Sequence, residues 1–274
     1  MIYNHPEFSV QLTGAPLLED SQFLFFHKGQ VLLYKGEYIP SYSQIAPLLP
    51  ENCIPFELAH TSEHTIFTLL PGDGAVIEEN EDFQYIRVFA SRSFPYERAA
   101  VIFACWHLWN WYAVNRFCGC CGQPTQPHEK ERALHCPACG HIRFPMIAPA
   151  MIVAVTCGDK ILLAQNLRAN YKHYALIAGF MEVGETLEHC VRREVKEETG
   201  VDVTDIRYLG DQPWGVSGSH MFAFHAKADC NQPLRMQESE LTDLRWFNRS
   251  EIEPRDNSIS IASVLIERFR RGEL

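Results

Sequence analysis

Residues 179–201 read GFMEVGETLEHCVRREVKEETGV. The spacing predicts a helix over residues 186–199, because Gly184 suits the turn before it and Gly200 suits its C-terminal stop. At 100° per residue, the apolar positions of this helix share one face with Glu194 and Glu198, while most of its basic residues point the other way. The carboxylates therefore continue the apolar stripe, whereas a solvated helix would place them opposite it.

The acidic side chains of this helix are predicted to lie close together. Spacings of three and four residues bring Glu194, Glu197 and Glu198 to within about 6 Å of one another. Each like-charge pair at that distance costs on the order of 3 kcal/mol at an effective dielectric of 20. Arg193 offsets part of this repulsion, but converging hard oxygen ligands suit Mg²⁺ or Mn²⁺. A solvated acidic helix is the alternative, and the glycines at both margins argue against it.

Paired cysteines predict a second metal site. Fourteen residues separate Cys118-x-x-Cys121 from Cys136-x-x-Cys139, and each pair can form a knuckle that directs two sulfurs to one point. Thiolate binding of zinc stabilises small modules by roughly 10–16 kcal/mol, far more than burial gives so short a segment. Ordinary thiols, a redox pair and a nucleic-acid-binding ribbon are the alternatives, but the doubled spacing and the weak local basic charge favour zinc. Thiolates fill all four positions, so we expect a structural zinc, with Cys120 as a bystander.

The rest of the chain predicts two flanking regions. Residues 1–95 mix short apolar runs with turn residues and predict a small, mostly β domain, which a helix over about residues 96–116 joins to the cysteine module. From residue 147 onward the pattern is that of an α/β domain. Ser258 is expected to cap its final helix. The expected strands span residues 151–156, 160–165, 206–209, 220–228 and 244–247.

The composition excludes several classes of protein. The chain has 274 residues, of which 46% are hydrophobic and 21% charged, which suffices for two or three domains and rules out a disordered or collagen-like chain. A net charge of −10 argues against sequence-blind binding of DNA or RNA. Residues 1–7 lack the features of a signal peptide, and polar residues interrupt the apolar stretch 99–117, which favours a buried helix over a membrane span. We therefore expect a cytoplasmic protein without membrane contact, whose paired cysteines hold metal in preference to forming disulfides.

The stretch 179–201 matches, letter for letter, the Nudix box G-x5-E-x7-R-E-U-x-E-E-x-G-U, where U is aliphatic. By this resemblance, residues 146–274 form a Nudix α/β/α sandwich, preceded by a zinc ribbon at residues 116–145 and by a small, mainly β N-terminal domain at residues 1–115. The implied reaction is hydrolysis of a nucleoside diphosphate linked to another group. A divalent ion would neutralise the pyrophosphate and lower the pKa of a bound water, while a carboxylate takes the proton.

Two further features narrow the resemblance to the NADH pyrophosphatase family. These are the zinc ribbon directly before the Nudix domain and the run Gln212-Pro213-Trp214 after the box. Members of this family split NAD(H) into NMN(H) and AMP, and some also remove NAD caps from RNA 5′ ends. The resemblance implies catalytic Mg²⁺ or Mn²⁺, one structural Zn²⁺ per chain, NAD(H) or NAD-capped RNA as the substrate, and a homodimer.

The resemblance also implies roles for single residues. The ligands of the catalytic metal would be Glu194, Glu197, Glu198, Glu240 and the carbonyl oxygen of Ala178, with Arg193 and Glu185 also in the catalytic set and with Glu240 or a box glutamate as the base. Phe144 and Phe180 would sandwich the nicotinamide ring. Other substrate contacts would be Glu131, Gln212, Pro213, Trp214, Gly215, Val216, Ser217, Gly218, Ser219, Ala262 across the dimer, and Lys35 and Arg87 in the N-terminal domain.

One segment departs from the family pattern S-Q-P-W-P-F-P-x-S. Residues 211–219 read DQPWGVSGS, so Gly215, Val216 and Ser217 stand where the pattern has Pro, Phe and Pro. The change loosens the loop and removes an aromatic face, which leaves ADP-ribose, another nucleoside diphosphate sugar or a dinucleoside polyphosphate open as the substrate. A ligand-sensing or nucleic-acid-binding protein on a Nudix-like body is a further alternative, against which the complete set of box glutamates and the acidic net charge argue.

Overall fold

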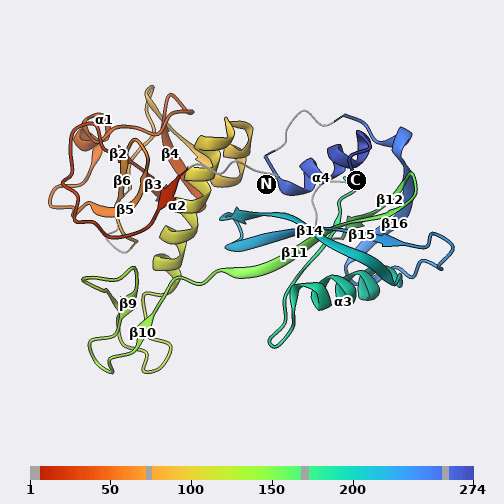
Figure 1. The fold of residues 1–274 in the computed structure, drawn as a ribbon. Coiled ribbons are helices and arrows are strands. Elements are labelled where there is room, and N and C mark those ends of the chain that lie inside the picture. The colour runs from red at the N-terminus through yellow and green to blue at the C-terminus, as the bar shows by residue number, and fades with distance from the viewer. Residues whose placement is uncertain (1–6, 72–75, 168–172, 255–258) are drawn as a thin grey trace. The chain divides into compact units, whose positions relative to one another are not determined.

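The computed structural model describes residues 7–71, 76–167, 173–254 and 259–274 (Figure 1). These residues form two compact units. One unit comprises Ile147–Trp214 and Ser219–Leu274, and the other comprises the described residues up to Met146 together with Gly215–Gly218. The short loop 215–218 therefore belongs with the N-terminal part of the chain, although the strands on either side of it belong to the C-terminal unit.

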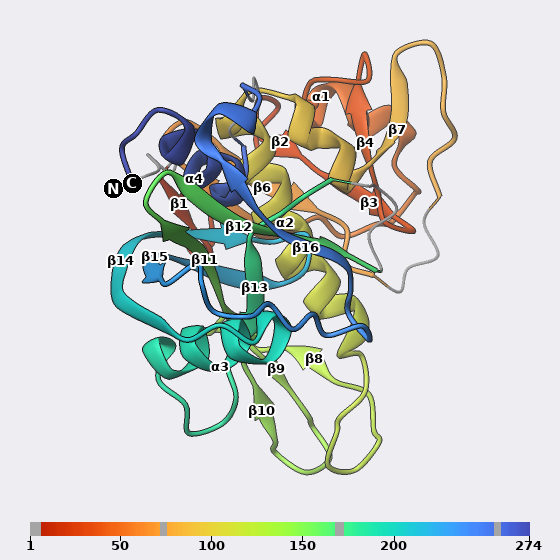
Figure 2. The same cartoon turned by 90° about the vertical axis from the view of Figure 1, so that its right-hand side faces the viewer.

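The C-terminal unit is built on a mixed sheet of six strands. Its strands are β11 (Ala148–Cys157), β12 (Lys160–Asn166), β13 (Ile177–Phe180), β14 (Val203–Trp214), β15 (Ser219–Ala228) and β16 (Leu241–Asn248). The order is β14-β15-β11-β12-β16, and β13 pairs with β11 (Figure 2). The β11–β15 pair is parallel and the other pairs are antiparallel. One edge of β11 thus pairs with β15 alone, and the other edge is shared by β13 and β12.

Two helices cover the two faces of this sheet, α3 (Leu187–Thr199) and α4 (Ile261–Arg270), and a 3-10 turn, η3 (Arg249–Glu251), follows β16 (Figure 1). Alternate residues of β11 point to opposite faces. Met151 and Val153 are buried in the core beneath α3, whereas Ile152 and Ala154 are buried in the core beneath α4. The expected α/β/α sandwich is confirmed, and the continuous apolar run of β11 is explained by burial on both of its faces.

The N-terminal unit is mainly β, as predicted. One sheet has the order β1-β5-β6-β2 and a second has the order β3-β4-β7. The elements are β1 (Phe8–Ser9), β2 (Gln22–Phe23), β3 (Phe25–His27), β4 (Gln30–Tyr34), α1 (Tyr42–Ile45), η1 (Ala46–Leu48), β5 (Phe56–Thr61), β6 (Thr65–Thr68), β7 (Phe83–Arg87), η2 (Val88–Ser93) and α2 (Tyr96–Val114). A small three-stranded sheet of order β10-β9-β8 follows α2, with β8 (Gln126–Pro127), β9 (Leu134–His135) and β10 (Ile142–Arg143).

The structure differs from the sequence predictions in three local features. Ser258 lies outside the described residues, and the N-cap of α4 is Ser260, whose hydroxyl accepts from the N–H of Ser263. The strand expected at residues 206–209 is longer than predicted and extends over Val203–Trp214. Its full length was not visible in the sequence, because two register shifts against β15 interrupt the alternation of apolar and polar residues. The strand β13, four residues long, has no counterpart among the predicted strands.

Two further observations concern the predictions about disulfides and about membrane-spanning helices. A disulfide joins Cys157, the last residue of β11, to Cys230, beyond the end of β15. No sequence pattern predicts this pair, because its members are 73 residues apart in the chain. None of the helices in the described ranges is long and apolar enough to cross a membrane.

Candidate active site and zinc ribbon

The carboxylate helix α3 lies against β13 at a glycine. A Cβ on Gly179 would lie 2.0 Å from the carboxyl carbon of Glu194 and 2.2 Å from its Oε1. Only a residue without a side chain lets this carboxylate rest on the strand. The helix begins where Thr186 accepts a hydrogen bond from the N–H of His189. It ends at Gly200, in the left-handed region at φ 75°, as the sequence predicted.

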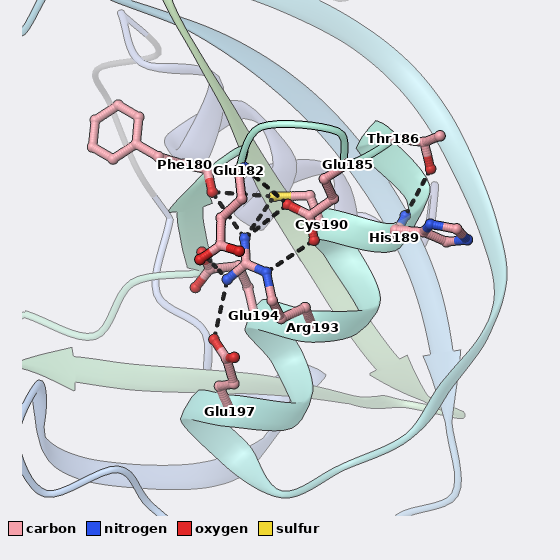
Figure 3. Close-up of polar contacts among 9 residues, drawn as sticks. All are labelled: Phe180, Glu182, Glu185, Thr186, His189, Cys190, Arg193, Glu194 and Glu197. Carbon is pink, nitrogen blue, oxygen red and sulfur yellow. Dashed lines mark hydrogen bonds and ion pairs between the residues drawn. The ribbon is translucent and has the colours of Figure 1, made fainter.

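Arg193 holds the box together (Figure 3). Its Nε and Nη2 donate to the two carboxylate oxygens of Glu185, both at 2.9 Å, and Nη2 also donates to the carbonyl of Phe180 at 3.0 Å. Its Nη1 donates to Glu194 at 2.9 Å and to Glu197 at 3.1 Å. The hydrogen bonds from Arg193 lower the pKa of Glu185 to about 2. Arg193 therefore fixes the loop between β13 and α3 (residues 181–186, the box loop) to α3 and neutralises part of the acidic cluster.

The most buried member of the cluster is Glu198, which is 6% exposed. Burial raises the pKa of its carboxyl to about 8, and the negative charges of Glu194, Glu240 and Glu197 act in the same direction. Burial also raises the pKa of Glu194. The segment that carries Glu240 is tied to the end of α3, because the N–H of Gln237 donates to the Glu198 carbonyl at 3.1 Å. Four carboxyl groups from two segments therefore act on one another electrostatically.

This acidic cluster fits a divalent cation by its chemistry. All its donor atoms are hard oxygens, the ligands that Mg²⁺ and Mn²⁺ prefer. Burial and the negative charges of the neighbouring glutamates all disfavour the ionised form of Glu198, whereas a cation held at the cluster would favour that form. Among the described residues, the four cysteines are the one group of three or more His, Cys, Asp or Glu side chains whose ligand atoms converge closely enough to hold a metal ion as they stand. In the acidic cluster, Arg193 lies between the carboxylates of Glu194 and Glu197.

The four cysteines of the ribbon converge as predicted. Their Sγ atoms all lie within 4.8 Å of one another, with 3.7 Å between Cys118 and Cys139 and 3.5 Å between Cys121 and Cys136. A tetrahedral zinc with bonds of about 2.3 Å separates its sulfurs by about 3.8 Å, so the spacing fits this metal. Hydrogen bonds from the backbone, that of Cys120 first, lower the pKa of Cys118 to about 6, which favours the thiolate that binds zinc.

The substrate residues predicted for the C-terminal unit have different surroundings. Phe180 is 56% exposed at the end of β13, next to Ala178 and Gly179. Gln212, by contrast, is buried and bonded to the start of α4: its Nε2 donates to the Ile259 carbonyl at 2.7 Å, and its Oε1 accepts from the N–H of Ile261 at 2.8 Å. Ser219 is buried, Ala262 lies half-buried in the first turn of α4, Pro213 is exposed and Trp214 is half-buried.

Close packing of the loop 215–218 against α2 accounts for part of its departure from the family pattern. An added Cβ at Gly215 would lie 2.0 Å from the carbonyl oxygen of Phe103 in α2. A Cβ at Gly218, where φ is 71°, would lie 3.2 Å from Nε2 of His107. Because proline carries a Cβ, the first proline of the pattern has no room at residue 215. Val216 is half-buried and Ser217 is exposed.

The remaining predicted contacts lie in the N-terminal unit. Phe144 is 58% exposed and Glu131 is exposed. Lys35 forms an ion pair with Asp82 just beyond one end of the β4–β7 ladder, whereas Arg87 pairs with Gln30 at the other end. Five residue steps separate the two positions, or about 16 Å along the strands. The structure therefore does not bring these two basic residues together.

Comparison with known proteins identifies two regions. Residues 146–269 match the NUDIX domain, and residues 114–144 match the NADH pyrophosphatase zinc ribbon domain. The chain is 42% identical over 159 residues to the NAD-capped RNA hydrolase NudC of Pseudomonas aeruginosa, a match that covers 58% of this chain and 57% of that one. It is 46% identical over 152 residues to the same enzyme of Vibrio vulnificus, covering 56% of this chain and 58% of that one. The matched region thus spans somewhat more than half the length of these curated relatives.

Among solved structures, a NUDIX hydrolase from Nitrosomonas europaea is 25% identical with a TM-score of 0.47, over 57% of this chain and 90% of that one. The first 113 residues lie outside both matched domains. The sequence prediction of a Nudix domain preceded by a zinc ribbon is confirmed by the two domain matches.

Proposed function

We propose that this chain, in which residues 146–269 match the NUDIX domain and residues 114–144 match the NADH pyrophosphatase zinc ribbon domain, hydrolyses the pyrophosphate of NAD(H) to NMN(H) and AMP. We propose NAD-capped RNA as a second form of the same substrate, in line with the names of the relatives from Pseudomonas and Vibrio. The observation that carries the proposal is the buried Glu198 carboxyl surrounded by like charges.

The proposed roles of the acidic residues follow from their positions. Glu194, Glu197, Glu198 and Glu240 would hold Mg²⁺ or Mn²⁺ together with the carbonyl of Ala178. A divalent cation in such a site neutralises the pyrophosphate and lowers the pKa of a water for attack on phosphorus. A carboxylate of the cluster accepts the proton of that water. Glu240 is exposed and Glu198 is buried, which suits Glu240 to proton exchange with solvent and Glu198 to cation binding.

Arg193 and Glu185 act by holding the site. The paired hydrogen bonds between them keep the box loop on α3, and the bond from Arg193 to the Phe180 carbonyl fixes the end of β13. The exposed ring of Phe180 offers a face on which a nicotinamide can stack. The contribution of Phe144 stays a prediction from the family resemblance.

A second candidate substrate is ADP-ribose or another nucleoside diphosphate derivative. The loop 215–218 supports it, because Gly215, Val216 and Ser217 remove the aromatic face and the two prolines of the family pattern. The same cluster of glutamates would serve either substrate, so the two candidates differ in the organic group next to the pyrophosphate.

A substrate panel tests the proposal. The full chain would be incubated with NADH, NAD, NAD-capped RNA and ADP-ribose in the presence of Mg²⁺ or Mn²⁺, and the products separated. We expect NMN(H) and AMP, with a loss of more than about 100-fold in Glu198→Gln. Glu188→Gln is the matched control, because Glu188 lies on the same helix with its carboxylate exposed and paired with Arg192. Intact dinucleotide beside cleaved ADP-ribose would favour the second candidate.

We also propose that the chain acts as a homodimer in the cytoplasm. Sedimentation equilibrium should then give twice the chain mass of 31.4 kDa. A mass that stays at that of one chain at enzyme concentrations giving full activity would exclude the dimer.

A further inference from the structure

We propose that Gln212 is a positioning residue that fixes the first turn of α4 on the face of the sheet from which Phe180 projects. The inference rests on the proposed function for its kinetic consequence. Its structural basis is independent of that function, because it lies in hydrogen bonds and strand register within the C-terminal unit.

The side chain of Gln212 is buried and makes two hydrogen bonds within the protein. It is 3% exposed, its Nε2 donates to the carbonyl of Ile259, and its Oε1 accepts from the N–H of Ile261. These two backbone groups flank Ser260, the N-cap of α4. A buried amide that satisfies two backbone groups has little left to offer a ligand, since its remaining N–H and lone pair are themselves buried.

The strand register connects this contact to Phe180. Gln212 pairs with Met221, Met221 pairs with Ala150, and Ala150 pairs with Phe180. These four residues form one row across β14, β15, β11 and β13, and residues directly opposite one another in a sheet point to the same face.

The face in question is the one that α4 covers. The neighbouring Gly179 lies against Glu194 of α3, so the next residue, Phe180, points away from α3. Figure 3 shows its ring directed away from the side chains around Arg193. Phe180 and the start of α4 therefore lie on one side of the sheet, and Gln212 ties that start to the row in which Phe180 lies.

The consequence for a dinucleotide follows from this arrangement. A ring stacked on Phe180 would occupy the α4 side of the sheet, while the acidic cluster that acts on the pyrophosphate lies on the α3 side. A shift in the first turn of α4 would change the space for the stacked group and leave the carboxylates in place. Loss of the Gln212 bridge should therefore raise KM with little effect on kcat.

The test compares the full-chain variants Gln212→Leu and Gln212→Glu with wild type. In Gln212→Leu we expect KM for NAD(H) to rise by about ten-fold or more, with kcat changed by less than about three-fold. Amide hydrogen exchange over residues 259–266 should accelerate by about ten-fold or more, while exchange in α3 stays the same. Gln232→Leu is the matched control, because the half-buried Gln232 also bridges backbone groups, those of Asp202, through hydrogen bonds that are exposed to solvent.

Gln212→Glu adds a readout that simple loss of packing would not give. An ionised carboxylate cannot donate to the Ile259 carbonyl, whereas a protonated one can. The KM ratio of this variant to wild type should therefore fall toward unity as the pH is lowered, while the ratio for Gln212→Leu stays constant.

Two results in Gln212→Leu would overturn the inference. Unchanged exchange at residues 259–266 would remove its structural basis, and a raised KM in that case would make Gln212 a substrate contact. Faster exchange with unchanged KM would make Gln212 an anchor of α4 without influence on the site. If wild type cleaves no dinucleotide, the proposed function fails, and the exchange measurement together with NAD binding by calorimetry still decides the role of Gln212.

Discussion

Replacing Glu198 by glutamine should change the pH dependence of stability in protein free of added divalent cation. The folded-state pKa of about 8 lies above the ordinary value of 4.5, so between these values the folded protein keeps a proton that the unfolded chain has released. The free energy of unfolding therefore falls as the pH rises through this window and levels off above about pH 8. Glu198→Gln lacks this titrating group, so its free energy of unfolding should fall less than that of the wild type over the same pH range.

The magnitude follows from the two pKa values. Their difference, 8 − 4.5 = 3.5, corresponds to about 5 kcal/mol at 1.36 kcal/mol per pH unit, which is an upper bound. Because Glu197 and Glu240 are exposed, water screens their charges and reduces this figure, so we expect the wild type to lose about 2–5 kcal/mol relative to the variant between about pH 5 and pH 8.5. Burial lowers the pKa of His225, which contributes with the opposite sign below pH 6.5; the difference between the two proteins removes this contribution.

Urea unfolding of the full chain, followed by circular dichroism at several pH values, measures the effect. Wild type and Glu198→Gln should diverge steadily as the pH rises, whereas Glu188→Gln should run parallel to wild type, because Glu188 is exposed. Excess magnesium should stabilise the wild type most at the high end of the range, where the carboxylate is ionised. Parallel curves for wild type and Glu198→Gln across the whole range would refute the reasoning.

Three further changes have defined outcomes. Gly179→Ala should lower kcat by about 100-fold or more with an unchanged circular dichroism spectrum, because the new Cβ would lie 2.0 Å from the carboxyl carbon of Glu194 and would push that carboxylate out of place. Gly119→Ala is the control and should be active in the same assay, because its Cβ would meet only Arg143, at 3.8 Å. Cys136→Ser should release zinc, detected with a chromogenic chelator, and make residues 118–145 sensitive to protease, because so small a sheet gains little from burial; a variant that retains zinc and resists the protease would contradict this. Arg193→Lys should weaken Mn²⁺ binding, measured by electron paramagnetic resonance, by about ten-fold or more, because lysine cannot form the paired bonds to Glu185; unchanged binding would show that the box loop holds its position without Arg193.

The sequence predicted the parts of the molecule that local pattern controls. The limits of α3 followed from Gly184 and Gly200, and the convergence of the four thiols followed from their spacing. Both depend on residues close together in the chain. The Nudix and zinc ribbon domains followed from motifs of the same local kind and are confirmed by the domain matches.

Features that depend on tertiary approach were missed. The sequence marked Gly179 as the first residue of a motif, but the need for a glycine there comes from the Glu194 carboxylate of a packed helix. Gln212 was expected to contact the substrate, and no local pattern could show that its amide is bonded to residues 47 and 49 positions further along. The place of Gly215 against the Phe103 carbonyl and the pairing of Cys157 with Cys230 are likewise set by segments remote in sequence.

The parallel pairing of β11 with β15 has a consequence for synthesis on the ribosome. Residues 148–156 find their partners only at residues 219–227, so a nascent chain that ends before β15 leaves an apolar strand with one open edge. Such an edge is prone to associate with other chains. The C-terminal unit should therefore mature late and depend on holdase chaperones in the interval, and stalling translation within β14 should give more aggregation than stalling after β15.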